Sequence, residues 1–131
     1  MDSQLSPQIE TQLRGSFGSI ELRSWTTENL DVAVKVIDCK LSSVLAVQCE
    51  AKVLSIVGWH PLFPKFYGIN GTHRLVMEDL GWYDDQGKYC VTTTQSLMGR
   101  SCLNRSQWID VCRQVVEGVM FFHDIAPLHA Q

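Results

Sequence analysis

The most informative hydrophobic pattern in the chain is a short apolar run, Asp31–Asp38, which is rich in β-branched residues and has aspartate at both ends. Such a run predicts a buried strand. Because side chains alternate along a strand, Val32, Val34 and Val36 share one face, and Lys35 lies on the other between apolar neighbours. A lysine is almost never fully buried without an opposite charge. The pattern therefore predicts that Lys35 meets a carboxylate or points into a cleft.

The segment after this strand has the periodicity of a helix that packs through one face. Between Leu41 and Val57 its apolar residues recur every three or four positions. This stripe consists of Val44, Val47, Ala51, Leu54 and Val57. Glu50 falls within the stripe, so a carboxylate faces inward on the helix as an ammonium does on the strand. An ion pair between Lys35 and Glu50 explains both positions. In the alternative, Lys35 extends past the strand edge and Glu50 tilts into water.

The remaining pattern of the first half predicts an antiparallel sheet. A hairpin is predicted over Thr11–Trp25, preceded by a polar leader that begins loosely. A second hairpin is predicted over 66–79, because Asn70-Gly71 stands between two apolar runs and is a strong turn signal. Together with the central strand, these segments predict an α+β fold with a five-stranded antiparallel sheet and one packed helix.

The second half of the chain is less regular. Gly81–Val91 is polar and acidic, and Thr92–Arg100 is a threonine-rich connection with room for a short helix. Asn104 is a suitable N-cap for a final helix, because Gln107 follows three residues later in the capping-box position. This long helix is predicted over Gln107–His123. Its apolar stripe consists of Trp108, Val111, Cys112, Val115, Val119 and Phe122.

Charge and composition restrict the partners and the compartment. The net charge of −3 provides no attraction to nucleic acid or to an acidic membrane. No apolar run approaches the roughly 20 residues of a membrane span, and the N-terminus lacks the apolar core of a signal peptide. The five cysteines are widely spaced, which is typical of reduced thiols rather than of a disulfide framework, a metal site or a redox site. These features predict a cytoplasmic or nuclear protein.

A glycine-containing turn precedes the Lys35 strand. Its sequence, Gly15-Ser16-Phe17-Gly18, suits a loop whose backbone N–H groups approach phosphate oxygens, and the same sequence also suits an ordinary hairpin turn. The turn is followed by Val32-Ala33-Val34-Lys35 and then by the helical Glu50. In this order the three motifs resemble the protein kinase superfamily, whose signature begins with a glycine-rich loop, the V-A-I-K lysine and the glutamate of the next helix.

The resemblance covers nearly the whole chain. Residues 59–69 look like the kinase segment that joins that helix to the fourth strand, and residues 74–80 look like the fifth strand and the hinge. Gln107–His123 resembles the long helix beneath the hinge, and Leu128-His129 looks like the start of the catalytic loop. The resemblance implies a single partial kinase domain over 1–131, made of a leader (1–12), an ATP-binding N-lobe (13–80) and a hinge connection with an incomplete C-lobe (81–131).

The resemblance also implies where the phosphates of ATP bind. Lys35 would hold the α- and β-phosphates, and Glu50 would orient it, because a compact ammonium suits phosphate oxygens. The turn would close over the β- and γ-phosphates with Gly15, Ser16, Phe17 and Gly18.

The adenine end of the implied site lies on the strands and the hinge. Ile20 and Ala33 match the kinase residues that roof the adenine, and Met77 matches the residue at the back of the nucleotide pocket. The main-chain groups of Glu78 and Leu80 match the hinge groups that hydrogen-bond the base.

The chain departs from the family pattern at two places. Leu13 stands where the family has the first loop glycine, and His129-Ala130-Gln131 stands where the family has H-R-D. The catalytic aspartate and the Asn and Asp that hold Mg²⁺ have no counterpart in these 131 residues. We therefore expect that this truncated chain binds ATP weakly and does not catalyse phosphoryl transfer, and that Mg²⁺ is a cofactor only of a full-length form.

Two functions follow from the resemblance. In the first, the chain is the ATP-binding lobe of a protein kinase whose full-length form phosphorylates a protein substrate. In the alternative, it is a pseudokinase-like binding or scaffold module that acts through protein–protein contacts. The apolar stripe of Gln107–His123 packs inside the larger lobe in the family, so here we expect it to bind a protein partner or to self-associate. A generic α+β domain with chance matches is a third interpretation, which the order of the motifs disfavours.

Overall fold

The computed structural model describes residues 5–6, 10–15, 18–40, 43–100 and 102–129, with the backbone alone for 10–15 and 126–129. The chain forms two compact units, Met1–Leu80 and Gly81–Gln131. Each unit is described by itself.

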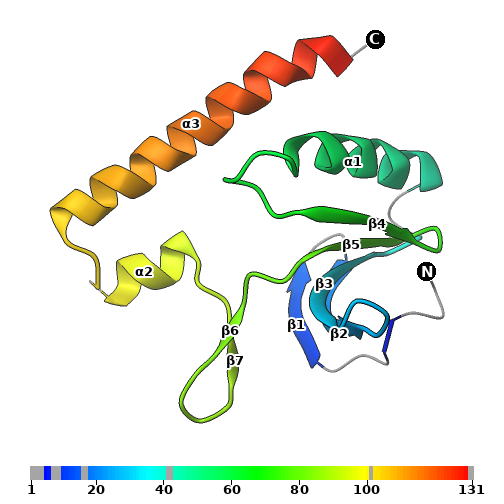
Figure 1. Ribbon diagram of the computed structural model, residues 1–131, viewed down its shortest axis with the longest axis horizontal. Coiled ribbons are helices and arrows are strands. Elements are labelled where there is room, and N and C mark those ends of the chain that lie inside the picture. The colour runs from blue at the N-terminus through cyan, green and yellow to red at the C-terminus, as the bar shows by residue number, and fades with distance from the viewer. Residues whose placement is uncertain (1–4, 7–9, 16–17, 41–42, 101, 130–131) are drawn as a thin grey trace. The chain divides into compact units, whose positions relative to one another are not determined.

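The first unit is built on an antiparallel sheet with the strand order β1-β2-β3-β5-β4 (Figure 1). The strands are β1 (Glu10–Gly15), β2 (Gly18–Trp25), β3 (Leu30–Ile37), β4 (Phe66–Asn70) and β5 (Arg74–Glu78). β3 pairs with β2 along its whole length on one side and with β5 on the other. The strand that carries Lys35 is therefore an interior strand, as its β-branched residues predicted.

One helix, α1 (Val44–Val57), lies against this sheet (Figure 1). The hydroxyl of Ser43 caps its N-terminus by accepting a hydrogen bond from a backbone N–H of the first turn. The helix was predicted to begin at Leu41, which lies outside the described residues. Gly58 ends the helix without the left-handed backbone of a glycine cap, since its φ is −63°. A Cβ at Gly58 would lie 2.9 Å from the carbonyl oxygen of Leu54, so glycine is needed here for close packing.

α1 closes a hydrophobic core on one face of the sheet. The buried residues of this core are Ile37, Val47, Ala51 and Leu75, and the half-buried residues packed against them are Leu54, Phe66, Ile69 and Met77. The apolar stripe predicted for α1 is confirmed at four of its five positions, because Val57 is buried as well. It is wrong at Val44, which lies in the first turn and is 41% exposed.

The opposite face of the sheet carries a second core, the outer core, made of Val32, Val34 and Val76. All three side chains are fully buried. The rings of Trp25 and Tyr67 pack against them and meet edge to face, with centroids 5.7 Å apart. Because a core lies on each face, both sides of β3 are covered.

Part of the leader is attached to the outer core. Leu5 forms a β-bridge with Trp25 and packs against the outer core. Ser6 bonds to Ser24 twice, through its backbone N–H and through its hydroxyl, and its carbonyl accepts from the Arg23 guanidinium. Three hydrogen bonds thus attach Ser6 to β2, whereas the first four residues, where the leader was predicted to begin loosely, lie outside the described residues.

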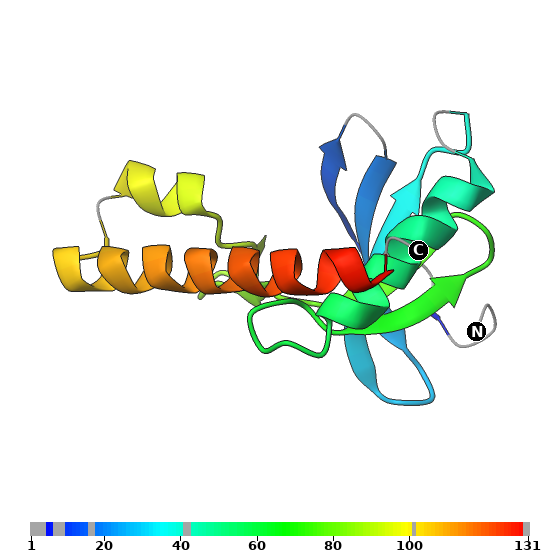
Figure 2. The same cartoon turned by 90° about the horizontal axis from the view of Figure 1, so that it is seen from above.

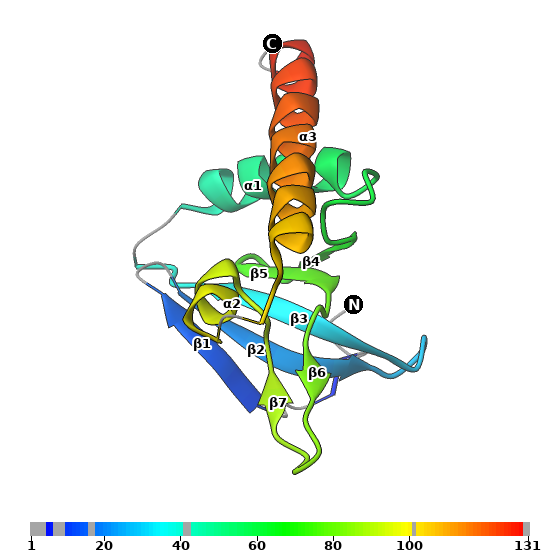
Figure 3. The same cartoon turned by 90° about the vertical axis from the view of Figure 1, so that its left-hand side faces the viewer.

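The second unit contains a small hairpin and two helices (Figures 1 and 3). Its elements are β6 (Trp82–Tyr83), β7 (Tyr89–Cys90), α2 (Thr94–Arg100) and α3 (Arg105–His129). The two-stranded β6–β7 sheet was not predicted, so the expectation of one sheet for the whole chain was incomplete. The carboxylate of Asp84 forms the turn by accepting from the N–H groups of Gln86 and Lys88.

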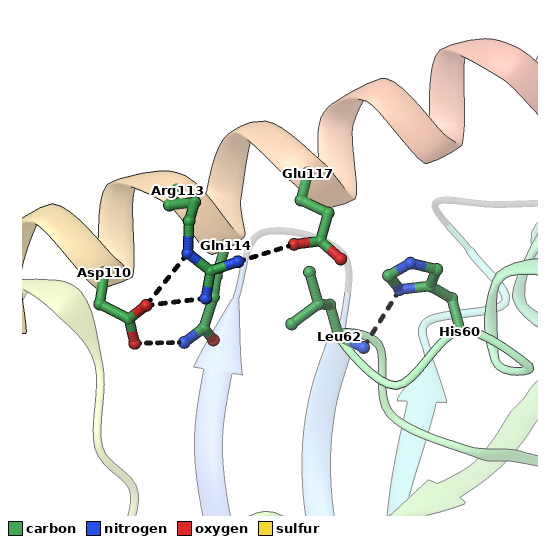
Figure 4. Close-up of polar contacts among 6 residues, drawn as sticks. All are labelled: His60, Leu62, Asp110, Arg113, Gln114 and Glu117. Atoms are coloured by element: carbon green, nitrogen blue, oxygen red, sulfur yellow. Dashed lines mark hydrogen bonds and ion pairs between the residues drawn. The ribbon is translucent and has the colours of Figure 1, made fainter.

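The long helix α3 begins with the predicted capping box. The side chain of Asn104 accepts from the N–H of Gln107 at 3.0 Å, and the side chain of Gln107 accepts from the N–H of Asn104 at 2.9 Å. Figure 2 shows α3 as one continuous helix, and it extends beyond the predicted range at both ends. A polar network on its surface links Asp110, Arg113, Gln114 and Glu117 (Figure 4). Its apolar side chains that are more than half exposed are Ile109, Val115, Val116, Val119 and Met120.

Three broader expectations concern membranes, metals and cysteines. Within the described part of the chain, no helix is long and apolar enough to cross a membrane. The described side chains include no group of three or more His, Cys, Asp or Glu residues placed to hold a metal ion. All five cysteines fall in the described ranges, and each is a free thiol.

We predict that Gly18→Ala destabilises the first unit by about 1–3 kcal/mol. An alanine Cβ would lie 2.0 Å from the carbonyl oxygen of Val36, and the φ of +154° at Gly18 is unfavourable for any residue with a side chain. Urea unfolding followed by circular dichroism measures the loss. Gly99→Ala is the matched control, because a Cβ there meets no atom within 4 Å. Equal effects of the two substitutions would contradict the prediction.

We also predict an alkaline effect at Tyr67. Burial, and then the negative charge of Glu78, raise the pKa of Tyr67 above its ordinary value. The folded state therefore favours the neutral phenol. This contribution to stability is complete below about pH 10, the ordinary tyrosine pKa, and is lost as the pH rises through the higher folded-state pKa. Tyr67→Phe should reduce the loss of unfolding free energy above about pH 10, whereas Tyr83→Phe, at an exposed ring, should leave that loss unchanged.

Candidate functional site

The predicted ion pair between the central strand and the helix is present. The Lys35 ammonium on β3 donates a hydrogen bond to Glu50 Oε1 on α1 at 2.5 Å. The two side chains are 34% and 38% exposed, so the pair lies at the edge of the α1 core and is open to solvent. The alternative, in which the two side chains turn away from each other into water, is wrong. An exposed pair of this kind contributes little to stability, because solvent screens the charges.

Strand register places the other predicted site side chains beside this pair. Ile20 on β2 lies directly opposite Lys35, and Ala33 lies opposite Met77 on β5. Directly opposite residues in an antiparallel pair project to the same face. Ala33 and Lys35 share a face because they are two residues apart. Ile20, Ala33 and Met77 therefore line the face of the sheet that carries Lys35.

The glycine turn closes the β1–β2 hairpin. Gly15 pairs with Gly18, and the two residues between them, Ser16 and Phe17, lie outside the described residues. Gly18 lies opposite Ile37 at the end of β3, where its backbone runs against the Val36 carbonyl. Contact between the strands is thus sufficient to require glycine at position 18. The glycine at position 18 is therefore no sign of a ligand by itself.

The two predicted hinge residues end the first unit. Glu78 is the last residue of β5, and Leu80 is two residues further on and 61% exposed. The backbone N–H of Glu78 donates to the carbonyl of Lys65 at 2.8 Å. The backbone N–H of Glu78 is therefore already bonded within the first unit.

The sequence did not predict that the side chain of Glu78 also bonds to Lys65. The carboxylate of Glu78 accepts a hydrogen bond from the backbone N–H of Lys65 at 3.0 Å. Lys65 is thus held to Glu78 by two bonds, which we call the 65–78 bracket. The pairing of β4 with β5 is irregular at this end, between Phe66 and Gly68. No periodicity or motif signals such a contact between residues 13 positions apart.

A hollow that the sequence did not predict lies at the end of α1. It has a volume of about 530 Å³ and is lined by Ser55, Gly58, Trp59, Lys65, Phe66 and Tyr67. The Trp59 side chain on its rim is 89% exposed. Nearby, His60 Nδ1 accepts from the backbone N–H of Leu62 and stabilises the turn between α1 and β4 (Figure 4). None of the predicted ATP residues lines this hollow.

The comparisons with known proteins bear on the fold. No protein-family model matches the chain, and no curated protein matches it. Among solved structures, the chain is similar to the crystal structure of Rad53 1-466 in complex with AMP-PNP, with a TM-score of 0.68 and 19% sequence identity. The match covers 93% of this chain and 31% of that one, so the chain spans less than a third of the length of the structure it matches. The fold is therefore protein-kinase-like, as the motifs predicted.

We predict that the Lys35–Glu50 pair contributes little to folding stability. Lys35→Met keeps most of the apolar stem and removes the charge, and it should change the free energy of unfolding by less than about 1 kcal/mol. Urea unfolding of Lys35→Met, Glu50→Gln and the double variant would measure the coupling between the two groups. A coupling well above about 1 kcal/mol would show that the pair is mainly structural.

Proposed function

We propose that this chain is the ATP-binding lobe of a protein kinase, whose longer form transfers a phosphoryl group from ATP to a protein hydroxyl. The observation that carries the proposal is the Lys35–Glu50 pair on an interior strand and its neighbouring helix, on the same face as Ile20, Ala33 and Met77. The pair is open to solvent and adds little to stability. A lysine held by one carboxylate at the solvent-exposed edge of an apolar core is well placed for an anionic ligand.

Each side chain has a distinct part in the proposed binding. Glu50 accepts one hydrogen bond from the Lys35 ammonium and holds it in place. The ammonium has two further N–H donors, which would bind oxygens of the α- and β-phosphates. Ile20, Ala33 and Met77 provide the apolar surface for the base, and the hinge carbonyl at Glu78 provides an acceptor. The turn at Gly15, Ser16, Phe17 and Gly18 would cover the phosphates.

The proposal divides the chain at the hinge. Residues 13–80 form the nucleotide-binding lobe, and residues 81–131 form the hinge connection and the first part of the larger lobe. When Mg²⁺ is bound with ATP in a complete kinase, it neutralises charge on the transferring phosphate. We assign no Mg²⁺ ligand to the described residues of this chain. We therefore propose nucleotide binding without phosphoryl transfer for these 131 residues.

A scaffold function is the second candidate. The observation that favours it is the set of exposed apolar side chains on α3. Exposed apolar side chains gathered on one helix are typical of a surface that binds a protein partner. In this case the chain would bind its partner through α3 equally well with and without nucleotide.

We predict that the chain binds ATP weakly and that Lys35→Met lowers the affinity by about tenfold or more, because a hydrogen bond to a charged group contributes about 1.5–3 kcal/mol. Isothermal titration calorimetry, or fluorescence with a labelled ATP analogue, measures this affinity. Lys40→Met, at an exposed lysine on the loop after β3, is the matched control and should bind as the wild type does. Wild-type binding that Lys35→Met leaves unchanged would contradict the proposed site.

We also predict no incorporation of phosphate into generic protein acceptors from radiolabelled ATP by the 131-residue chain. Incorporation that disappears in Lys35→Met would show that the chain is a catalyst by itself. Incorporation that persists in this variant would indicate a contaminating kinase.

A further inference from the structure

Ser6 is the one serine or threonine of the sequence that is followed by proline. The other three prolines of the chain follow His60, Phe63 and Ala126. A serine before a proline is the acceptor that proline-directed protein kinases require when they transfer the γ-phosphoryl group of ATP to a hydroxyl. The sequence thus contains a single acceptor for this class of enzyme.

The structure holds Ser6 to β2 through both its backbone and its half-buried side chain. Its backbone N–H donates to the Ser24 carbonyl at 2.9 Å, and its hydroxyl oxygen accepts from the Ser24 N–H at 2.8 Å. Its carbonyl accepts from the Arg23 guanidinium at 3.0 Å. The preceding residue, Leu5, is paired with Trp25 and packs against the outer core. The hydroxyl therefore reaches the active site of a modifying kinase only when this attachment opens.

The charged groups next to this attachment are unfavourable for a phosphate. Arg23 donates two hydrogen bonds to Glu21, through Nε and Nη2, and the two side chains are only 15% and 14% exposed. The Ser24 hydroxyl donates to the Asp31 carboxylate at 2.6 Å. The two residues that bond to Ser6 thus supply one guanidinium, and each of them is bonded to a carboxylate. A phosphoserine carries about −1.5 to −2 charges at pH 7 and is disfavoured beside carboxylates by repulsion and by the cost of desolvation.

We propose that Ser6 is a phosphorylation site for a separate proline-directed kinase, and that its phosphorylation detaches residues 5–6 from β2 and uncovers part of the outer core. The Ser6 hydroxyl oxygen forms a bond to the γ-phosphorus of ATP, the bond from that phosphorus to the leaving oxygen of ADP breaks, and the hydroxyl proton passes to the modifying kinase. The product has an ester oxygen where Ser24 N–H needs an acceptor, and it adds a charged group at a half-buried position. Attachment and modification therefore oppose each other. This inference does not depend on nucleotide binding at Lys35.

The first measurement compares the rate at which a cyclin-dependent kinase and ATP phosphorylate the 131-residue chain and a synthetic peptide of residues 1–12, with the site mapped by mass spectrometry. The peptide should react at least about tenfold faster, because Ser6 of the folded chain is available only while it is detached. Leu5→Ala removes apolar contact with the outer core, so it should speed the reaction of the folded chain by about threefold or more. The same substitution in the peptide should leave its rate unchanged.

Two further variants control for the position of the phosphate. Ser6→Ala should take up no phosphate. Ser55→Ala, at an exposed serine of α1 that isoleucine follows, should be modified as the wild type is.

The second measurement follows hydrogen exchange at the backbone N–H of Ser24, which donates to the Ser6 hydroxyl in the attached state. Complete phosphorylation should speed this exchange by about tenfold or more, because the leader no longer covers that N–H. The N–H groups of α1 around Val47 belong to the core on the other face of the sheet and should exchange as before.

Three results would overturn the inference. Equal rates for the peptide and the folded chain would show that residues 5–6 are not attached to β2. A phosphorylated chain whose Ser24 N–H exchanges as slowly as before would show that the phosphate is accommodated beside Arg23. A peptide that the kinase does not modify would show that Ser6 is not an acceptor. None of the three bears on ATP binding at Lys35, so the proposed function stands or falls separately.

Discussion

The ion pair between Lys35 and Glu50 joins the two elements on which the first unit is built. β3 is the interior strand of the sheet, and α1 closes the core on one face of that sheet. The pair stands at the edge of this core, with about a third of each side chain open to solvent. A charge in this position is solvated well enough to be tolerated, yet it is held in one place by its partner. In the proposed function, the fixed position and the exposure together leave the ammonium accessible to an anionic ligand.

The charged residues Lys35 on β3 and Glu78 on β5 lie on opposite faces of the sheet. Lys35 faces the side on which a ligand would lie in the proposed function, whereas Glu78 faces the outer core and bonds to the backbone of Lys65. Register alone separates these roles, because a one-residue difference along a strand moves a side chain to the opposite face. The similarity to Rad53 1-466 concerns the fold.

Much of this arrangement was predictable from local patterns. Three signals lie each within one element: the run of β-branched residues around Lys35, the stripe that contains Glu50 and the Asn104–Gln107 capping box. The structure confirms them, apart from Val44 in the stripe. The β6–β7 hairpin was missed because its turn depends on the Asp84 side chain rather than on apolar alternation. The attachment of Leu5 and the 65–78 bracket were missed because they join residues distant in sequence, at positions that no periodicity marks.

The alternation of neighbours along β3 has a consequence for how this protein can diverge. Val32 and Val34 belong to the outer core, and Ala33 and Lys35 lie on the face that carries the proposed site. Core packing and, in the proposed function, ligand binding would therefore constrain alternate residues of a single short segment. A homologous chain that lost the ammonium and kept the valines would keep the sheet and lose the proposed contact with phosphate.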